Sequence, residues 1–219
     1  EGFTSYISSL CMNKLMERNN PRPYAGSYRG YYALVKSGME EPQTTHSDRY
    51  DTNFAYSIAA YSKGAVFLAQ LGYIIGDDAL AQTLKAYYKH FKFTHPTPND
   101  FIRTAEKISG AHLGWYLNDF TKTSKTIDYA VGEVSANGDT TTVTLERKGA
   151  IAMPIDLVVT HNDQSVHHYY IPLTEMRAEK PNETEGERTV LSDWSWAKPS
   201  YTFELPIDLG DIQKIQIDP

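Results

Sequence analysis

Residues 59–78 read AAYSKGAVFLAQLGYIIGDD, and this stretch decides the fold of the first half of the chain. From Ala65 to Ile75 nearly every position is apolar, so a helix formed here has no polar side to turn toward water. We therefore expect a helix that is buried in the middle of a domain. Residues 77–93 continue with apolar residues at helical spacing on one side, which predicts a second, amphipathic helix.

Helical spacing also extends upstream of this stretch. Apolar residues recur close to a 3.6-residue period from Phe3 to Met16, and the sequence RNNPRP that follows cannot continue a helix. A second upstream helix is expected from Tyr24 to Lys36. Residues 37–53 (SGMEEPQTTHSDRYDTN) are expected to form a loop that is long enough to suggest a functional surface.

Downstream, the sequence HPTPNDF has the features of a helix start. Thr97 is suited to cap the helix, Pro98 fits the first helical position, and Asp100 lies three residues after the cap. We expect this helix to run to Ser109, where Gly110 ends it, and a short helix rich in aromatic residues to cover residues 112–121.

After Lys125 the apolar residues alternate with a period of two, which is typical of strands. Residues 126–149 form two such runs around Asn137-Gly138, a hairpin signal, and residues 154–173 repeat the design around Asn162-Asp163. Several short strands with regular turn signals favour a β-sandwich. The sequence thus predicts an α+β multidomain chain, with a helical domain at residues 1–123 and a β-sandwich domain at residues 124–219.

Composition excludes several classes of function. The 219 residues carry a net charge of −6 and no Lys/Arg-rich run, which argues against nucleic acid as a partner. No stretch approaches about 18 uninterrupted apolar residues, so we expect no membrane span. Cys11 is the single cysteine and lies in an apolar helical pattern, so it is expected to be a small buried side chain without a disulfide or zinc role.

The sequence lacks a complete active site of its own. It has no H-E-x-x-H zinc motif, no G-x-S-x-G nucleophile motif and no glycine-rich phosphate loop. His167 and His168 are neighbours on an expected strand, so they point to opposite faces and cannot share one ion. The other histidines have no spacing suited to a metal, and we expect these residues alone to bind no zinc.

Several stretches nevertheless match one known family in their order and spacing. They are EGFTSYIS (residues 1–8), AAYSKGAVFLAQL (residues 59–71), HPTPNDFIRTAEKISGAHLGWYLNDF (residues 95–120), KTSKTIDYAV (residues 122–131) and WSWAKPSYTFELP (residues 194–206). Together they resemble the aminopeptidase N family of zinc metallopeptidases, which are gluzincin aminopeptidases. The resemblance implies the all-helical C-terminal part of a thermolysin-like catalytic domain, followed by a β-sandwich.

The resemblance also implies roles for two residues. Glu1 stands where the family has its third zinc ligand, and Tyr61, in the family's Tyr-x-Lys-Gly motif, stands where a tyrosine donates a hydrogen bond to the oxyanion. Tyr56 is the rival candidate for the catalytic tyrosine, but no Lys-Gly follows it. Lys63 is expected to be a structural partner or a helix-start charge, and Tyr61 itself has the alternative of being one more core aromatic residue.

The departures from the family pattern define what we expect of this chain. The H-E-x-x-H helix and the G-x-M-E-N strand are absent, so the chain resembles a C-terminal fragment whose parent would bind zinc and cleave peptides, while the fragment alone would be inactive. Its first partner would be the missing N-terminal part of the same polypeptide. Because bacterial relatives are often exported, a soluble parent in the periplasm or cell envelope is favoured over a cytoplasmic one.

Two other classes of function remain open at the level of sequence. The first is a metal-free module on the same scaffold that binds peptides or carbohydrates. The second is a structural domain with an aromatic-rich interaction face, since the chain contains 16 tyrosines.

Overall fold

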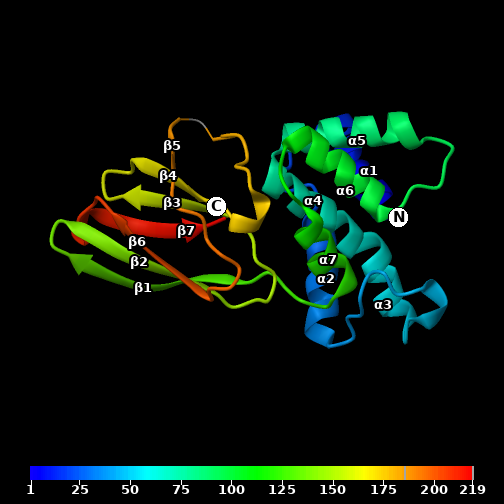
Figure 1. The fold of residues 1–219 in the computed structure, drawn as a ribbon, viewed down its shortest axis with the longest axis horizontal. Coiled ribbons are helices and arrows are strands. Elements are labelled where there is room, and N and C mark those ends of the chain that lie inside the picture. Colours follow the sequence, from blue (N-terminus) through cyan, green and yellow to red (C-terminus); the bar gives the residue numbers. More distant parts are fainter. Residues whose placement is uncertain (185, 219) are drawn as a thin grey trace. The chain divides into compact units, whose positions relative to one another are not determined.

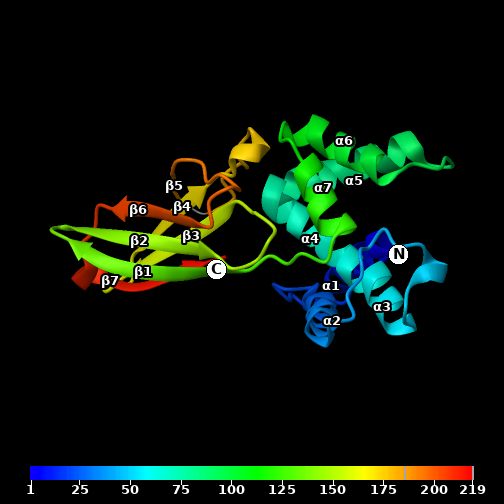
Figure 2. The same cartoon turned by 60° about the horizontal axis from the view of Figure 1, so that its bottom comes forward.

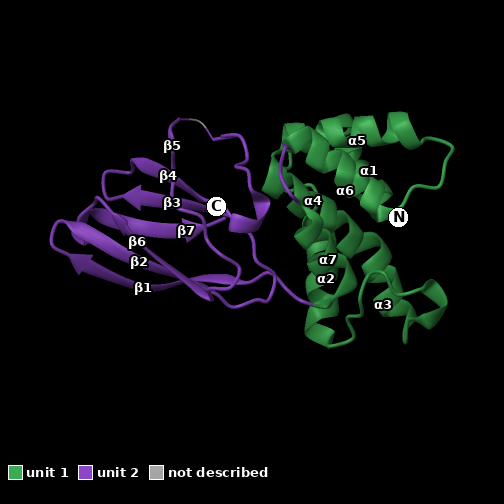
Figure 3. Cartoon of the chain, in the orientation of Figure 1, with its two compact units in different colours: residues 1–109, 113–124 green, residues 110–112, 125–219 purple. Residues whose placement is uncertain are grey.

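The computed structural model describes residues 1–184 and 186–218; Pro219, where the second predicted domain ends, and Glu185 lie outside the described residues. The chain forms two compact units (Figure 3). The helical unit comprises residues 1–109 and 113–124, and the β unit comprises residues 110–112 and the chain from Lys125 onward. The order, helices first and strands second, is the α+β arrangement expected from the sequence.

The helical unit contains a series of α-helices interrupted by one short 3-10 helix and one π-helix (Figure 1). In chain order they are α1 (Gly2–Leu15), α2 (Ala25–Ser37), the 3-10 helix η1 (Ser47–Arg49), α3 (Asn53–Ser57), the π-helix η2 (Ile58–Lys63), α4 (Gly64–Ile75), α5 (Asp77–Phe91), α6 (Pro98–Ser109) and α7 (Gly114–Lys122). The loop expected at residues 37–53 is present at residues 38–52, because Ser37 ends α2 and Asn53 begins α3, and η1 is its helical turn.

Helix α4 is the core of this unit, as the apolar sequence predicts. Leu68, Leu71 and Ile74 are fully buried, and α4 contacts α1, α2 and α5 (Figures 1 and 2). Among the described residues, the continuous helical run Asn53–Ile75 is the one long and apolar enough to cross a membrane. Because 61% of its most apolar window is buried inside the protein, it has the features of a core helix.

The start of α6 follows the predicted pattern, with one difference in the hydrogen bonds. The helix begins at Pro98, and the Asp100 carboxylate accepts hydrogen bonds from the backbone N–H and the hydroxyl of Thr97, at 2.8 and 2.7 Å. Asp100 therefore reaches back to the residue before the helix, as in a capping box, while the Thr97 hydroxyl acts as donor to that carboxylate. These hydrogen bonds lower the pKa of Asp100 below its usual value.

The prediction that Cys11 is buried is wrong. Cys11 is exposed, because α1 turns much of its apolar surface to solvent in this structure. The exposed apolar residues on α1 and just after it are Ile7, Leu10, Met12, Leu15 and Met16. Only Tyr6 is buried among the described residues of this helix, so the apolar pattern correctly predicted the helix but not the environment of its side chains.

The β unit consists of two sheets. One has the strand order β1-β2-β6 and the other the order β5-β4-β3-β7, with every pairing antiparallel except β4 with β5. The strands are β1 (Tyr129–Asn137), β2 (Thr140–Arg147), β3 (Ile155–His161), β4 (Val166–Ile171), β5 (Arg188–Val190), β6 (Ser200–Leu205) and β7 (Ile212–Ile217). Both expected hairpins are present, and Gly138 has the positive φ of 61° that the first turn requires.

Side chains from both sheets form one buried core, as in a β-sandwich. Val143 and Leu145 of β2 and Leu157 and Val159 of β3 are fully buried in this cluster. Trp194 packs beside them, with its ring 5.4 Å from the ring of Tyr129. The alternation of buried and partly exposed residues along β2 and β3 is the period of two seen in the sequence.

Candidate active site

Tyr61 lies on the π-helix η2, in the middle of the helical run that leads into α4. A π-helix has one more residue per hydrogen-bonded turn than an α-helix, and such turns occur frequently at functional sites. The side chain of Tyr61 is 46% exposed, whereas its neighbours Ala59 and Lys63 are fully buried. Tyr61 is therefore not one more core aromatic residue, and its hydroxyl is accessible.

Glu1 lies beside Tyr61, although the two are 60 residues apart in sequence. Glu1 precedes α1, and its backbone carbonyl accepts the first hydrogen bond of that helix, from the N–H of Ser5. The negative charge of the nearby Glu1 carboxylate raises the pKa of Tyr61 above its ordinary value, and partial desolvation and the polar interaction of the two side chains raise it further. The structure thus brings together the two residues that the sequence singles out.

A contact between two glycines makes this proximity possible. A Cβ atom on Gly2 would lie 2.5 Å from the Cα atom of Gly64, and a Cβ atom on Gly64 would lie 2.7 Å from the Cα atom of Gly2. Real Cβ atoms do not approach backbone atoms so closely, so both positions require glycine. The start of α1, which carries Glu1, and the junction of η2 with α4 can therefore approach each other closely enough for Glu1 and Tyr61 to meet.

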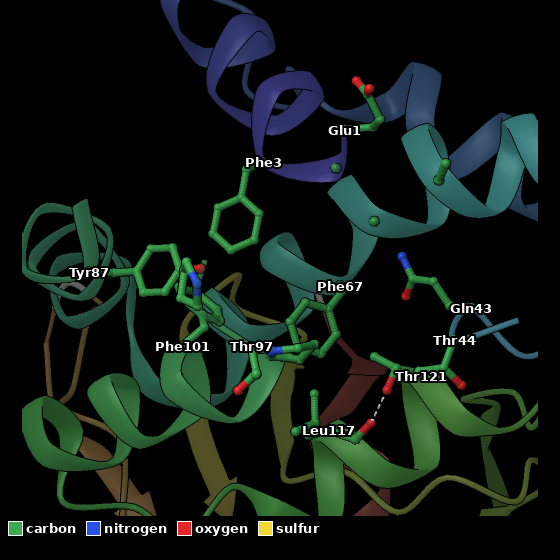
Figure 4. A pocket seen from close by; sticks show the side chains of 15 residues that line it. Glu1, Phe3, Gln43, Thr44, Phe67, Tyr87, Thr97, Phe101, Leu117 and Thr121 are labelled. Carbon is green, nitrogen blue, oxygen red and sulfur yellow. Dashed lines mark hydrogen bonds between the residues drawn. The ribbon is translucent and has the colours of Figure 1, made fainter. Parts of the chain in front are cut away.

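A pocket of about 550 Å³ opens next to this contact (Figure 4). Its lining is mainly apolar and aromatic, and Phe3, Phe67 and Phe101 face into it. Glu1 lines its edge, and the Glu1 carboxylate is directed away from the aromatic side chains. The other lining residues are Gly2, Gln43, Thr44, Ala60, Gly64, Tyr87, Pro96, Thr97, Pro98, Leu117 and Thr121.

Gln43 contributes a buried polar side chain to the lining of the pocket. Its Nε2 atom donates a 3.0 Å hydrogen bond to the backbone carbonyl of Ala59 on η2, and its Oε1 atom is buried without a hydrogen-bond partner in the described structure. Thr44, the next residue, donates its backbone N–H to the carbonyl of Thr121 near the end of α7. The loop between α2 and η1 is therefore attached both to η2 and to α7.

Lys63 is a buried charge two residues after Tyr61. Its side chain is fully buried, and Nζ donates hydrogen bonds to Oε1 of Glu40 at 2.8 Å and to the backbone carbonyl of Thr123 at 3.2 Å. The ammonium group also lies 5.8 and 5.4 Å from the ring centroids of Tyr31 and Phe120. The prediction that Lys63 is a structural partner is confirmed.

The described residues do not complete a metal site. No group of three or more His, Cys, Asp or Glu side chains lies close enough together to hold an ion in residues 1–184 and 186–218. Glu1 offers one carboxylate, and a catalytic zinc ion usually takes three protein ligands. His161 and His167 belong to the β unit and have ring centroids 5.7 Å apart, and none of the described carboxylates or cysteines completes such a group with them.

Sequence reasoning missed the residues that surround the Glu1–Tyr61 pair. Glu40 and Gln43 lie in the long loop, which the sequence indicated only as a possible functional surface. Two acidic residues followed by proline (EEP, residues 40–42) offered no signal that one of them pairs with Lys63. The sequence does offer a signal for the two glycines, because Gly2 directly follows Glu1 and Gly64 comes three residues after Tyr61.

Comparison with known proteins identifies the family. A family profile described as the peptidase family M1 domain matches residues 1–122. The chain therefore belongs to the M1 peptidase family. No curated protein sequence matches the chain significantly.

Solved structures give a more distant similarity. One is the crystal structure of Legionella pneumophila aminopeptidase A in complex with aspartic acid, which is 15% identical in sequence with a TM-score of 0.45. The match covers 70% of this chain and 16% of that protein. The chain thus spans about a sixth of the length of this aminopeptidase, and a likeness at this level carries no argument about its activity.

Proposed function

We propose that the chain is part of a zinc-dependent aminopeptidase that removes residues from the amino ends of peptides. In this proposal Glu1 is a zinc ligand and Tyr61 donates a hydrogen bond to the oxygen that becomes negatively charged when the peptide carbonyl is attacked. The observation that carries the proposal is the pairing of Glu1 with Tyr61 at the Gly2–Gly64 contact, within the segment that matches the M1 family.

The state of Tyr61 suits this role. A hydrogen-bond donor to an oxyanion must keep its proton at the working pH, and a preorganised donor of this kind contributes strongly to catalysis. Glu1 holds the pKa of Tyr61 above its ordinary value of about 10, so the phenol is neutral and able to donate throughout the neutral range. The exposure of the side chain leaves the hydroxyl accessible to a substrate.

The zinc ion of this proposal needs ligands beyond residues 1–219. When bound, such an ion polarises the scissile carbonyl and activates water. Because the described residues contribute the single carboxylate of Glu1, we expect the chain by itself to bind no catalytic zinc and to have no peptidase activity. The proposal therefore places the other ligands and the general base in sequence upstream of Glu1.

Zinc content and turnover, measured side by side on two chains, test this proposal. One chain is residues 1–219 and the other is extended upstream of Glu1 with its natural sequence; the substrate is a fluorogenic amino-acyl amide. We expect stoichiometric zinc and turnover in the extended chain only, and loss of zinc when Glu1 is replaced in Glu1→Gln. Stoichiometric zinc in residues 1–219 alone would contradict the ligand assignment.

The rival tyrosine can be tested in the same assay. Tyr56 lies on α3, is 38% exposed and packs against Tyr50 with ring centroids 5.6 Å apart. If Tyr61 is the oxyanion donor, kcat should fall much further in Tyr61→Phe than in Tyr56→Phe. A larger decrease in kcat in Tyr56→Phe than in Tyr61→Phe would assign the role of oxyanion donor to Tyr56.

The pocket favours a second candidate function, a metal-free module that binds peptides or carbohydrates. Its aromatic lining and the unpaired Oε1 atom of Gln43 could receive an apolar group that carries one hydrogen-bond donor. Calorimetric titration of residues 1–219 with short peptides and oligosaccharides, in the presence of a chelator, tests this function. Binding that is lost in Gln43→Leu, together with an extended chain that neither binds zinc nor turns over, would favour it.

The cellular location belongs to the same proposal. We place the parent protein in the bacterial periplasm or cell envelope, on the grounds of the family resemblance. Fractionation of cells that express the full-length gene, followed by immunoblotting, tests the location, and recovery in the cytoplasm would exclude it.

A further inference from the structure

The buried pair of Lys63 and Glu40 has no role in the proposed chemistry, yet it lies next to the residue that does. The two side chains are 0% and 6% exposed. Placing an ammonium group in such surroundings is unfavourable unless it is paired and hydrogen bonded, and burial accordingly lowers the pKa of Lys63. A leucine or methionine would fill the same space without this cost, so the charge calls for a separate explanation.

The direction of the two side chains supplies that explanation. Residues two positions apart on an α-helix point about 200° away from each other, and the wider π turn also keeps them on opposite sides. Lys63 points into the core, and Tyr61 points out to the solvent and toward Glu1. Contacts that hold the Lys63 side chain in the core therefore also determine the direction of the Tyr61 side chain.

The direction of Tyr61 depends on whether residues 58–63 keep their π conformation. A π turn contains one more residue than an α turn. If the π turn tightens to an α turn, the hydrogen-bond register shifts by one residue, and the side chains beyond it rotate by about 100° about the helix axis. A rotation of that size would carry the Tyr61 hydroxyl away from the Glu1 carboxylate. Contacts that hold η2 in its π conformation are thus contacts that hold the site together.

Two contacts of this kind come from one short segment of the loop between α2 and η1. Glu40 binds Nζ of Lys63 at the end of η2, and Gln43 donates to the carbonyl of Ala59 near its start. The carbonyl of Thr123, after α7, provides a third attachment, again through Lys63. We call Lys63, Glu40, Gln43 and the Thr123 carbonyl the η2 clamp.

We propose that the η2 clamp positions Tyr61 against Glu1 by holding residues 58–63 in the π conformation, with the Lys63–Glu40 pair as its central contact. Lys63 is then a positioning residue that acts through Tyr61. The catalytic meaning of this positioning rests on the proposed function, whereas the positioning itself is a property of residues 1–219.

The clamp can be tested by ¹⁹F NMR on the 219-residue chain, labelled with 3-fluorotyrosine. The Tyr61 signal is assigned from its absence in Tyr61→Phe, and its response to Glu1 is measured as the change in chemical shift caused by Glu1→Gln. In the unchanged chain we expect a clear response. In Lys63→Met we expect the Tyr61 signal to move toward that of a free tyrosine and the response to Glu1→Gln to be lost.

A matched control separates positioning from a general loss of stability. Lys180 pairs with Asp156 in the β unit, beside the ring of Tyr170, and so offers a partly buried ion pair of the same chemical type, far from Tyr61 in sequence. Lys180→Met should leave the response of Tyr61 to Glu1→Gln unchanged. If Lys63→Met does not fold, Glu40→Gln, which keeps a hydrogen-bond acceptor for Lys63, replaces it and should reduce the response.

Retention of the full Glu1 response in folded Lys63→Met, or in Glu40→Gln where Lys63→Met does not fold, would overturn the proposal. In the extended chain, Lys63→Met should lower kcat on the order of tenfold to a hundredfold, with KM and zinc content little changed, as expected for a misplaced catalytic group. If the extended chain is inactive in every variant while the ¹⁹F result holds, the proposed function fails and the positioning role stands.

Discussion

Each unit of the protein contains a lysine that pairs with a carboxylate beside an aromatic ring. In the helical unit Lys63 pairs with Glu40, and the side chains are 0% and 6% exposed; in the β unit Lys180 pairs with Asp156, and they are 9% and 18% exposed. The first pair connects a loop to a π-helix next to the candidate active site. The second connects a loop to strand β3, where the unit already has a continuous apolar core.

The difference between the two pairs shows how context decides what a contact does. The β unit is stabilised by strand pairing and a shared core, so its ion pair adds to a fold that other contacts already specify. In the helical unit η2 also packs against α1 and α2, and the role proposed for the ion pair is to hold η2 in the conformation that directs Tyr61 toward Glu1. The first of the following predictions tests this comparison directly, and the others test the burial and packing on which the two units depend.

Loss of the first lysine should be the most damaging. Lys63→Met leaves the Glu40 carboxylate buried and without its partner, which typically costs about 3–5 kcal/mol of stability. Lys180→Met should cost less, about 1.5–3 kcal/mol, because both side chains of that pair keep some contact with water. Chemical denaturation followed by circular dichroism measures the free energy of unfolding of both variants. Equal decreases would show that the two ion pairs contribute equally to stability and would contradict the comparison.

Alkaline unfolding should begin at about pH 10. Burial raises the pKa of Tyr129 and of Tyr170 to about 12, whereas an unfolded tyrosine titrates near 10. Because the folded state keeps these protons and the unfolded state loses them, their contribution to stability is fully present below pH 10 and is lost as the pH rises from 10 to 12. Each unit of pKa difference corresponds to about 1.4 kcal/mol.

Absorbance at 295 nm and circular dichroism, recorded together against pH, check this prediction. We expect most tyrosines to titrate with the loss of secondary structure rather than before it, and Tyr170→Phe to lessen the loss of stability above pH 10. Full titration of the tyrosines near pH 10 with the fold intact would contradict the assignment of these groups as buried.

The contact between α1 and η2–α4 should not tolerate a methyl group. Gly64→Ala places a Cβ atom 2.7 Å from the Cα atom of Gly2, and such overpacking costs about 1–3 kcal/mol. The Glu1 response of the Tyr61 ¹⁹F signal should be reduced as well, since the two helical segments must separate. An unchanged melting temperature and an unchanged response would show that the contact does not determine the site.

A glycine elsewhere in the same unit should behave in the opposite way. Gly26 lies in the first turn of α2, and a Cβ atom there would have the far end of Arg29 as its nearest neighbour, at 3.9 Å. Gly26→Ala should stabilise the protein by about 0.4–1 kcal/mol, because alanine restricts the unfolded chain and favours the helix. Thermal unfolding beside Gly64→Ala measures the contrast, and destabilisation by Gly26→Ala would refute it.

The sequence predicts the elements of both units well, because each is determined locally. The apolar run before Ile75 predicts the core helix, and Asn137-Gly138 predicts the first hairpin, since only a few residues control each of these choices. The prediction for Cys11 failed for the opposite reason. Burial depends on what packs against a helix face, and the pattern of α1 does not contain that information.

The candidate site was predictable only in part. Glu1 and Tyr61 could be identified from motif resemblance, but their proximity depends on the Gly2–Gly64 contact, which joins residues far apart in sequence. The π conformation of η2 has no sequence signature, because it is imposed by partners elsewhere in the unit. The clamp residues Glu40 and Gln43 lie in a loop, where spacing gives no indication of tertiary partners.

The measurement that tests the central claim most directly is kcat of the extended chain as Tyr61→Phe, with zinc content determined on the same sample. Removing an oxyanion donor typically lowers kcat by about 10²–10³-fold. We predict a loss of that order with zinc retained, and no comparable loss in Tyr88→Phe, which removes a hydroxyl from a tyrosine that is 69% exposed on α5. Unchanged turnover in Tyr61→Phe would contradict the assignment of this site.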